Sequence, residues 1–397
     1  MVDPCTNPWL TIIGIGEDGL AGLSEASRKA LAAAETVYGG ERHLRLAGVD
    51  GRGKAWPVPF DASCVLSQRG RRTAMLASGD PFWHGAGGSL AAQLSSDEWI
   101  AYPSPSTFSL AASRLGWGLE NAICIGLHAA PFERLVPLLS RGARIICLVR
   151  DAAAAADLAQ WLDARGWGAS KLWILSALGG PREHVVESRA GSYEAPSAVS
   201  PLAVAIEADG KAGLSRASGL CDDLFRHDGQ ITKRPIRALA LSALAPRPGE
   251  RLWDIGAGSG SISVEWALAG GTAIAIEARQ DRAANIRANI EAFGLAHRIS
   301  IVTGTAPAAL SSIEKPDAVF IGGGLDAALF AAIWSLVTAS TRIVAHGVTL
   351  ETEALLSGLH QKHGGDLLRI EIAHAAALGR YRSWEAARPV VQWSVAR

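Results

Sequence analysis

The chain has 397 residues, of which 49% are hydrophobic and 19% are charged, and its formal net charge at pH 7 is +0. This length exceeds what one hydrophobic core usually serves, so we expect two globular domains. The balanced charge excludes a chain-wide basic field of the kind that attracts nucleic acid. No apolar run is long enough to span a membrane, and residues 1–10 lack the basic and apolar regions of a secretory signal, so we expect a cytoplasmic protein.

The cysteines and histidines predict neither disulfides nor a metal site. The cysteines are scattered, odd in number and free of C-x-x-C pairs, which is typical of a reducing compartment: Cys5, Cys64, Cys124, Cys147 and Cys221. His360 and His363 are spaced for one helix face, but no carboxylate or cysteine pattern accompanies them. We therefore predict no bound metal.

The N-terminal part begins with a strand, a glycine turn and a helix. Residues 9–16 (WLTIIGIG) indicate a buried strand that ends in glycines. A helix capped by Ser24 follows, and we expect it to continue to the glycines at 39–40.

Further units of the same kind follow. A strand at 73–77 leads through the turn at 79–81 into a helix from about residue 87, and the segment 103–116 places Ser106 and Thr107 at a helix start. After residue 143 come the strand RIICLV, a helix over 151–165, and the strands in KLWILSALGG and PLAVAIEA. Alternating strands and helices predict a mostly parallel sheet in each part.

Residues 208–222 are small, polar and unpatterned, and we interpret them as a linker between domains at 1–207 and 223–397. The second domain offers seven strand candidates with helices between most of them, including a helix over 281–293. The last two strands lack a crossover of helix length between them, so we expect them to pair antiparallel.

The stretch 251–260 (RLWDIGAGSG) organises the second domain. An apolar strand leads into three glycines at alternate positions and then into a helix, so a ligand can approach the backbone without Cβ interference. Glu277 ends the next apolar run, where a carboxylate usually holds a ribose diol. The G-x-G-x-G spacing, together with Asp254 and the antiparallel end of the sheet, favours S-adenosylmethionine over NAD. A purely structural alternative is that Asp254 caps the following loop.

Two resemblances fit this organisation. Residues 9–206 resemble the tetrapyrrole methylase family through GIGEDG at 14–19, SGDPFWHG at 78–85 and PSPSTFSLAASRLG at 103–116. DIGAGSGSISVEWA, AIEARQDRAANIRANIEAFG and TGTAPAAL, with HDGQITKRPIRA upstream, resemble the small class I methyltransferases of cobalamin biosynthesis. Two departures from the tetrapyrrole methylase pattern are Ser104, where many members have glycine, and GIGEDG in place of G-x-G-P-G-D.

The resemblance implies an α/β protein with a two-lobed tetrapyrrole methylase domain and a Rossmann-like, seven-stranded class I methyltransferase domain. It implies methylation of precorrin-6B at C5 by the first domain, and methylation at C15 with decarboxylation of the C12 acetate by the second, giving precorrin-8. S-adenosylmethionine would occupy one site in each domain. The implied cofactor contacts are Gly14, Gly79, Asp80, Ser106 and Thr107 in the first domain, and Thr232, Asp254, Gly256, Ala257, Gly258, Ser259, Gly260, Glu277 and Ala306 in the second.

Basic and histidine side chains are the candidates for substrate contact. A polycarboxylate substrate favours arginine and lysine near the cofactor, which indicates Lys233, Arg234, Arg237, Arg380, Arg382 and Arg388. His227 and His346 are candidate proton shuttles, although a buried structural histidine is the common alternative, and His84 is expected to line the first cleft.

Two other functions remain open at this stage. One is an RNA methyltransferase, disfavoured by the neutral charge and by IGGG in place of an N-P-P-Y-like run. The other is a single active methyltransferase domain fused to a non-catalytic scaffold domain. For the main hypothesis we expect a small tetrapyrrole as partner, neither nucleic acid nor membrane, and a homo-oligomer.

Overall fold

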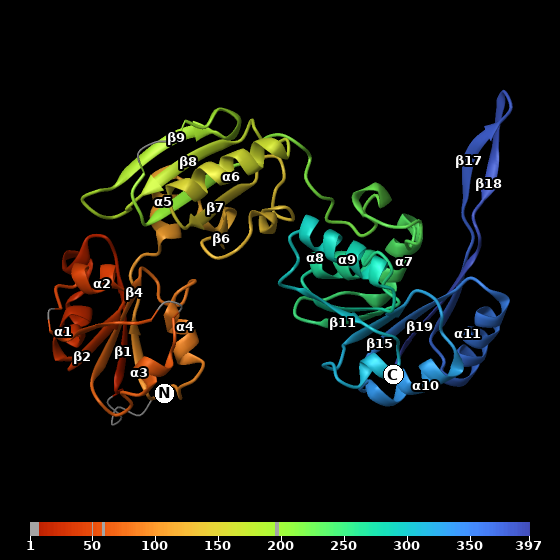
Figure 1. Ribbon diagram of the computed structural model, residues 1–397, viewed down its shortest axis with the longest axis horizontal. Helices are drawn as coiled ribbons and strands as arrows, with labels where there is room; N and C mark the ends of the chain where they lie inside the picture. Colours follow the sequence, from red (N-terminus) through yellow and green to blue (C-terminus); the bar gives the residue numbers. More distant parts are fainter. Residues whose placement is uncertain (1–7, 50, 58–59, 195–197) are drawn as a thin grey trace. The chain divides into compact units, whose positions relative to one another are not determined.

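The computed structural model describes residues 8–49, 51–57, 60–194 and 198–397. Cys5 and most of the N-terminal stretch tested for a signal lie outside these residues. The chain divides into two compact units, one formed by residues up to 130 with 138–212, the other by 131–137 with 213–397 (Figure 1). The described residues include no helix that is both long and apolar enough to cross a membrane.

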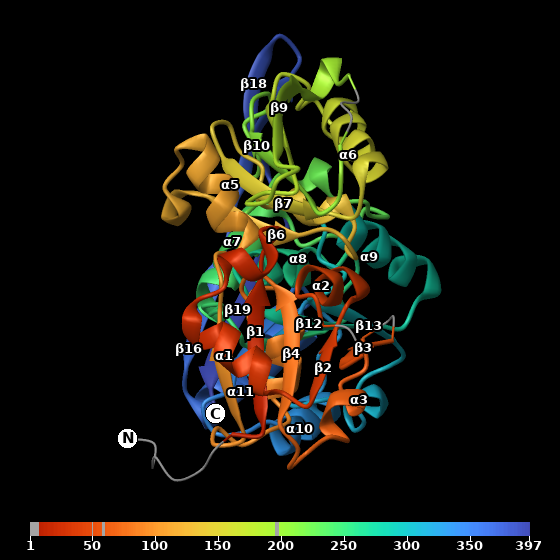
Figure 2. The same cartoon turned by 90° about the vertical axis from the view of Figure 1, so that its left-hand side faces the viewer.

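The first lobe of the N-terminal unit is a parallel sheet in the order β3-β2-β4-β1-β5. Its strands β1, β4 and β2 lie side by side in Figures 1 and 2. The strands are β1 (Leu10–Ile15), β2 (Thr36–Gly39), β3 (Gly53–Ala55), β4 (Thr73–Ser78) and β5 (Trp99–Tyr102). The helices of this lobe are α1 (Glu25–Ala33), α2 (Glu41–Leu46), α3 (Ser63–Leu66) and α4 (Ala86–Ala91), with the 3-10 turn η1 (Gly19–Gly22).

One helix boundary differs from the sequence prediction. Ser24 caps α1 as expected, since its hydroxyl accepts the N–H of Ser27 at 3.1 Å. The helix ends at Ala33, however, and Thr36–Gly39 form β2 instead of a continued helix. β-branched and aromatic residues favour a strand here, and pairing with β4 buries Val37 and Tyr38.

The second lobe has a sheet in the order β6-β7-β10-β8-β9, so the prediction of a mostly parallel sheet is wrong here. Of the strand pairs that the structure describes in this lobe, β6–β7 alone is parallel. β10 lies between β7 and β8 and pairs antiparallel with both, and β8 and β9 are antiparallel as well. The strands are β6 (Ile123–Gly126), β7 (Arg144–Val149), β8 (Lys171–Ser176), β9 (His184–Arg189) and β10 (Leu202–Glu207). Around them lie α5 (Thr107–Leu115), α6 (Ala152–Ala164), η2 (Leu119–Asn121) and η4 (Ala190–Ser192).

The C-terminal unit is built on a seven-stranded sheet in the order β13-β12-β11-β14-β15-β19-β16. The first five strands are parallel. β19 pairs antiparallel with β16, as predicted for the last two strands, and it also pairs antiparallel with β15. The strands are β11 (Arg251–Ile255), β12 (Thr272–Glu277), β13 (Ile299–Thr303), β14 (Ala318–Ile321), β15 (Arg342–Gly347), β16 (Asp366–Ile370) and β19 (Val390–Ala396).

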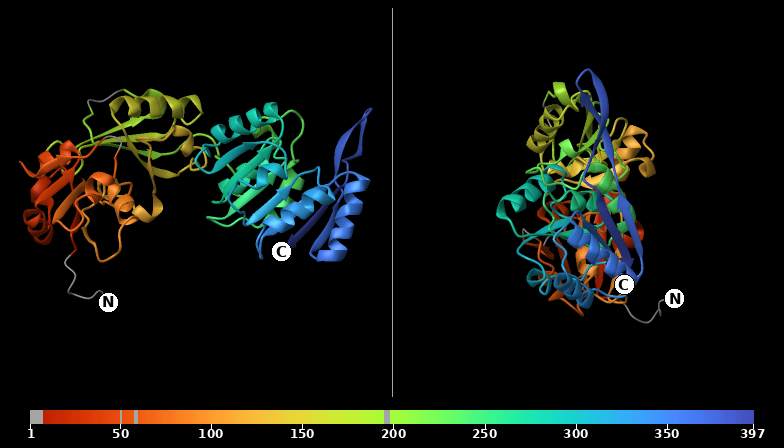
Figure 3. Two further views of the ribbon diagram at one scale, coloured as in Figure 1. Left: turned by 60° about the horizontal axis from the view of Figure 1, so that its bottom comes forward. Right: turned by 90° about the vertical axis from the view of Figure 1, so that its right-hand side faces the viewer.

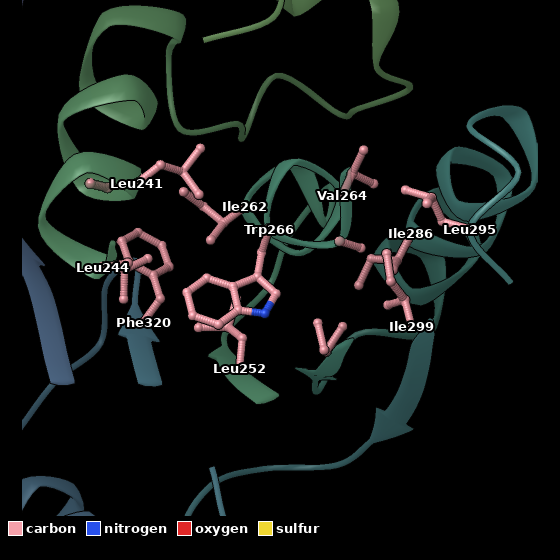
Figure 4. Packing of buried hydrophobic residues seen from close by; sticks show 14 of the residues in the cluster. Leu241, Leu244, Leu252, Ile262, Val264, Trp266, Ile286, Leu295, Ile299 and Phe320 are labelled. Carbon is pink, nitrogen blue, oxygen red and sulfur yellow. The ribbon is translucent and has the colours of Figure 1, made fainter. Parts of the chain in front are cut away.

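Helices cover both faces of this sheet (Figure 1). The helical segments are α7 (Arg234–Leu244), α8 (Ser261–Leu268), α9 (Gln280–Ala292), α10 (Ala327–Leu336) and α11 (Leu350–His363), with η5 (Asp222–Leu224) and η6 (Ala308–Leu310), while η3 (Phe132–Leu135) comes from the 131–137 segment. On the face covered by α7–α9, Trp266 packs among Leu244, Leu252 and Phe320 (Figure 4). This core fixes the start of α8 against the end of β11, where the candidate site lies.

A two-stranded hairpin extends away from the C-terminal sheet (Figure 3). It consists of β17 (Ala373–Leu378) and β18 (Tyr381–Ala386), which pair with each other and form a sheet of their own. The sequence analysis missed these strands. We call residues 373–386 the arm.

Candidate functional site

The glycine turn of the C-terminal unit has the conformation that its sequence predicts. Gly256, Gly258 and Gly260 have φ values of 67°, 59° and 72°, a region that residues with a Cβ rarely adopt. Among the described residues, the nearest atom to a Cβ on Gly256 would be the Gly323 carbonyl oxygen at 4.0 Å. Space is therefore open above the first glycine, as a close ligand requires.

Asp254 and Glu277 lie at the ends of neighbouring strands and are both buried. The Asp254 carboxylate accepts two hydrogen bonds from Ser263, one from the backbone N–H at 3.2 Å and one from the side-chain hydroxyl at 2.7 Å. Asp254 therefore holds the first turn of α8. Burial raises the pKa of Asp254 to about 6, the Ser263 hydrogen bonds oppose this, and the negative charge of Glu277 adds to it. The Glu277 carboxylate accepts the N–H groups of Gly258 and Arg279.

A segment from residue 225 to 232 runs beside the glycine turn. Asn289 of α9 anchors it, because its side chain bonds the backbone of Arg226 in both directions and also donates to the Ser259 carbonyl at 2.8 Å. Asp228 adds an ion pair with Arg282 at 2.9 Å. The hydrogen bonds of Asn289 thus hold the segment that contains the predicted contact Thr232 against the glycine turn.

Arg237 has a role different from the predicted substrate contact. Its side chain is fully buried and forms ion pairs with Glu265 at 2.6 Å and Asp222 at 2.9 Å. It also donates to the carbonyl oxygens of Leu220 and Thr232. Because the guanidinium is used within the protein, Arg237 joins α7 and α8 to the preceding segment and is not available to a substrate carboxylate.

The candidate histidines lie in different surroundings. His346 is buried on β15, its Nε2 lies 2.9 Å from Oε1 of Gln392, and its ring packs edge-on against Phe320. Burial lowers the pKa of His346, so the ring is neutral and held in the core, which fits a structural histidine and argues against the predicted proton shuttle. His227 is half-buried in the segment beside the glycine turn, where Nδ1 accepts the Gly229 N–H.

The other predicted contacts of this unit lie on the surface or in loops. Ala306 follows β13 and packs against the core on the α10 side. Lys233 and Arg234 are exposed at the start of α7. Arg380 and Arg382 are exposed on the arm, and Arg388 is exposed just after it. The structure does not join the arginines of the arm to the glycine turn.

In the N-terminal unit, three strand ends meet so closely that side chains are excluded. A Cβ on Gly14 would lie 1.8 Å from the carbonyl oxygen of Gly79 and 2.7 Å from the backbone nitrogen of Ser104. The Ser104 hydroxyl donates to the Gly14 carbonyl at 2.8 Å, which explains how serine is accommodated at this departure from the family pattern. Gly79 itself has a φ of 52°.

Beside this junction lies a cavity of about 460 Å³ that is lined by both lobes. Predicted residues Asp80, Ser106 and Thr107 line it, whereas Gly14 and Gly79 form the junction next to it. Ser106 is the N-cap of α5 and accepts the Ser109 N–H at 3.1 Å. His84 lines the cavity as expected. The volume of this cavity falls within the range of small-molecule pockets, about 300–1,000 Å³.

Two family models match this chain. One, described as Tetrapyrrole (Corrin/Porphyrin) Methylases, matches residues 9–193, and the other, described as Precorrin methyltransferase domain, matches residues 223–397. A protein from Sinorhizobium sp named precorrin-6Y C(5,15)-methyltransferase (decarboxylating) is 47% identical over 98% of this chain and 96% of its own length. The chain belongs to the precorrin-6Y C(5,15)-methyltransferase family. As a member of this methyltransferase family, it uses S-adenosylmethionine.

Two shorter proteins are also similar to this member of the precorrin-6Y C(5,15)-methyltransferase family. One from Saccharolobus solfataricus, named probable cobalt-precorrin-6B C(15)-methyltransferase (decarboxylating), is 42% identical over 34% of this chain and 71% of its own length. The crystal structure of the C-terminal domain of precorrin-6Y C5,15-methyltransferase from Rhodobacter capsulatus is 59% identical, with a TM-score of 0.46, and covers 46% of this chain and 100% of that one.

The residues at the glycine turn of this precorrin-6Y C(5,15)-methyltransferase family member fit the methyl donor. The open space above Gly256 admits a ligand close to the backbone. The Ser259 hydroxyl is buried and has no hydrogen-bond partner among the described residues. Asp254 and Glu277 are buried carboxylates at neighbouring strand ends, and carboxylates suit a ligand that carries a ribose diol and positive charges. Among the described residues, no group of three His, Cys, Asp or Glu side chains is placed to hold a metal.

The sequence analysis missed several side chains that line the N-terminal cavity. They come from other strand ends or the loops after them: His43, Trp56, Trp83, His128 and Arg150. Arg150 directly follows β7, and His43 lies on the short helix after β2. The rule that ligands bind at the carboxyl ends of parallel strands would have suggested both positions once β2 was recognised.

Proposed function

We propose that this protein transfers methyl groups from S-adenosylmethionine to C5 and C15 of precorrin-6B and removes carbon dioxide from the C12 acetate, giving precorrin-8. The observation that carries the proposal is the 47% identity over 98% of the chain to a protein named for this activity. A small tetrapyrrole, rather than a nucleic acid, is then the partner. The scattered free cysteines favour a reducing compartment, so the cytoplasm is the proposed location.

Two cofactor sites, one in each unit, are part of the proposal. In the C-terminal unit, Glu277 would hold the ribose and Asp254 would face the positively charged end of the donor. In the N-terminal unit, the cavity beside Gly79 would hold the second molecule, with Asp80, Ser106 and Thr107 in contact. The close packing at Gly14 supports this placement, because it brings the polar strand ends to one cavity.

The C-terminal unit is proposed to methylate C15 and to assist decarboxylation. The name of the shorter Saccharolobus relative pairs these two steps in a chain that aligns with 34% of this one. When bound, the donor supplies an activated sulfonium methyl group. The protein's task is mainly to align that group with an electron-rich carbon, and the conjugated macrocycle can accept the electrons released with carbon dioxide.

Separate substitutions in the two units test this division. Asp254→Ala should abolish C15 methylation and decarboxylation but leave C5 methylation measurable by mass spectrometry. Asp80→Ala should have the reverse effect. Asp281→Asn is the matched control, because Asp281 is exposed and pairs only with Arg279 in the described residues. Retained C15 methylation in Asp254→Ala would refute the assignment.

A calorimetric titration with S-adenosylhomocysteine tests the number of sites independently of the substrate. Two molecules should bind each chain, and each substitution should remove one of them. A single binding event that only Asp254→Ala removes would mean that the N-terminal unit is a scaffold.

A homo-oligomer is also proposed, and the arm supports it. Two-stranded hairpins are marginally stable alone in water. Leu378, Tyr381 and Trp384 of the arm are 63%, 65% and 75% exposed. Burial of these side chains against another copy would stabilise the arm. Sedimentation should find an assembly that Trp384→Ser weakens, whereas Leu350→Ser on α11, also an exposed apolar position, should leave it intact. A monomeric wild-type protein would overturn the proposal of a homo-oligomer.

A further inference from the structure

A second cavity in the N-terminal unit is lined by an unusual set of basic side chains. It has a volume of about 400 Å³ and is bounded by Glu17, Arg42, Arg45, Leu46, Arg182 and Ser200. Three guanidinium groups thus face one carboxylate, and the excess positive charge lies on the cavity wall. Glu17 belongs to the GIGEDG motif at 14–19, but Arg42, Arg45 and Arg182 belong to none of the motifs of the sequence analysis, and the cofactor cavity does not account for this concentration of charge.

Glu17 holds two of these arginines in place through ion pairs. Its side chain is 5% exposed, with one oxygen bonded to Arg42 and the other to Arg182 at 3.0 Å. A buried carboxylate needs such partners, because an unpaired charge in the interior is costly. Glu17 therefore fixes two guanidinium groups at the cavity while it neutralises only one of their charges.

Among the described residues, Arg45 and Arg182 keep donor groups that no other group uses, and these can bind an anion. In the part of the chain that the structure describes, Arg182 bonds Glu17 through Nη2 alone, and its side chain is 55% exposed. Arg45 lies one helical turn from Arg42 on α2, so both project from the same side of that helix. Within the part of the chain that the structure describes, Arg45 has no ion pair. Guanidinium groups placed in this way match the geometry of a carboxylate.

Arg42 connects this cavity to the cofactor cavity. Its Nη2 donates to the Ser78 hydroxyl at 2.6 Å and lies 2.9 Å from Nε2 of His43. Ser78 and His43 both line the larger cavity. Burial lowers the pKa of His43 to about 4, and the positive charge of Arg42 adds to this, so the imidazole is neutral. One molecule could therefore contact both cavities across this group.

We propose that the cavity bounded by Arg42, Arg45 and Arg182 is a carboxylate subsite that anchors an acidic side chain of the tetrapyrrole. The inference rests on the proposed function and adds to it the residues that hold the substrate for C5 methylation. An anchored acetate or propionate would orient the macrocycle relative to the donor in the adjacent cavity. The other possible source of a carboxylate is the amino-acid end of the cofactor, and the experiment separates the two.

Arg45→Gln, Arg182→Gln and Arg182→Lys test the subsite in the full-length protein. Each Gln variant should raise KM for C5 methylation about tenfold, the loss expected for one or two charge-assisted hydrogen bonds in a partly exposed site. The kcat for C5 methylation, C15 methylation and the affinity for S-adenosylhomocysteine should stay within about twofold. Arg182→Lys should recover part of the loss. Arg72→Gln is the control, since Arg72 is exposed and pairs with Glu35 away from both cavities.

Arg45→Gln keeps the test independent of folding, because this variant breaks no ion pair of the described residues. Binding of uroporphyrin, a stable tetrapyrrole whose side chains are all acetates and propionates, gives a readout without catalysis. Its affinity, followed by quenching of tryptophan fluorescence, should also fall about tenfold in both Gln variants.

The outcomes distinguish the subsite from the proposed function. Unchanged KM and uroporphyrin affinity in both Gln variants would overturn the subsite. Loss of S-adenosylhomocysteine affinity with unchanged tetrapyrrole affinity would assign the cavity to the cofactor and overturn it as well. A wild type that methylates no precorrin would refute the proposed function, while the uroporphyrin titration would still decide whether the cavity binds carboxylates.

Discussion

Asp254→Asn should make the protein more stable and less able to bind its methyl donor. The carboxyl pKa of about 6, against 3.8 for an ordinary aspartate, means that the ionised group is less favourable in the folded state. A difference of about two pKa units corresponds to about 3 kcal/mol at neutral pH. Asparagine keeps an oxygen for Ser263 and carries no charge. Since its amide group must also find a partner, we expect a gain of about 1–3 kcal/mol at pH 7.

The pH dependence of the unfolding free energy tests whether the raised pKa of Asp254 causes the gain in stability. Because the pKa of Asp254 is higher in the folded state than in the unfolded state, the protonated carboxyl stabilises the fold relative to the ionised one. This stabilisation is complete below about pH 3.8 and is lost as the pH rises through about 6. The difference in unfolding free energy between Asp254→Asn and wild type should therefore grow from pH 4 to pH 7 and then level off. Denaturant unfolding, followed by the fluorescence of buried Trp253 and Trp266, measures it. A variant that is no more stable at pH 7, or a difference that does not change with pH, would refute the reasoning.

Three further substitutions probe features of the two units. Arg237→Met should lower the unfolding free energy by about 3–5 kcal/mol, because Glu265 stays buried without its partner; a loss below 1 kcal/mol in denaturant titration would contradict this. Gly260→Ala should cost about 1–3 kcal/mol, given a φ of 72° and a new Cβ 2.9 Å from Ile286, and calorimetry should find weaker S-adenosylhomocysteine binding. Ser106→Ala should lower the stability by about 1 kcal/mol by removing the cap of α5, whereas Ser109→Ala, which keeps the backbone N–H, should cost less.

Much of the fold follows from local pattern. The strand, glycine turn and helix at 251–268 could be predicted because each glycine position demands a backbone that other residues avoid. The antiparallel end of the C-terminal sheet followed from connection length. The strand order of the second lobe could not be predicted in the same way. β10 lies between β7 and β8, and this pairing of segments distant in sequence leaves no pattern in the local sequence.

The candidate site was predicted only where backbone geometry specifies it. Asp80, Ser106 and Thr107 lie in turns and caps, and the structure brings them to one cavity. Arg237 looked like a substrate ligand because its sequence neighbours are basic, yet its buried partner Glu265 lies on another helix. Composition cannot distinguish a buried arginine from an exposed one when its partners are distant in sequence. The arm was missed for a related reason, since its strands cover no hydrophobic core.

The position of β19 also constrains the order in which the molecule can be made. This strand lies between β15 and β16, although it follows both in the chain. Until residues 390–396 have left the ribosome, β15 and β16 have no common neighbour, and the faces that later pack on Trp393 stay open. The C-terminal sheet is therefore completed only after residue 396 has been made, when the N-terminal unit can already be folded. Ribosome-bound chains halted before residue 390 should bind hydrophobic dyes and be cleaved readily within the C-terminal unit.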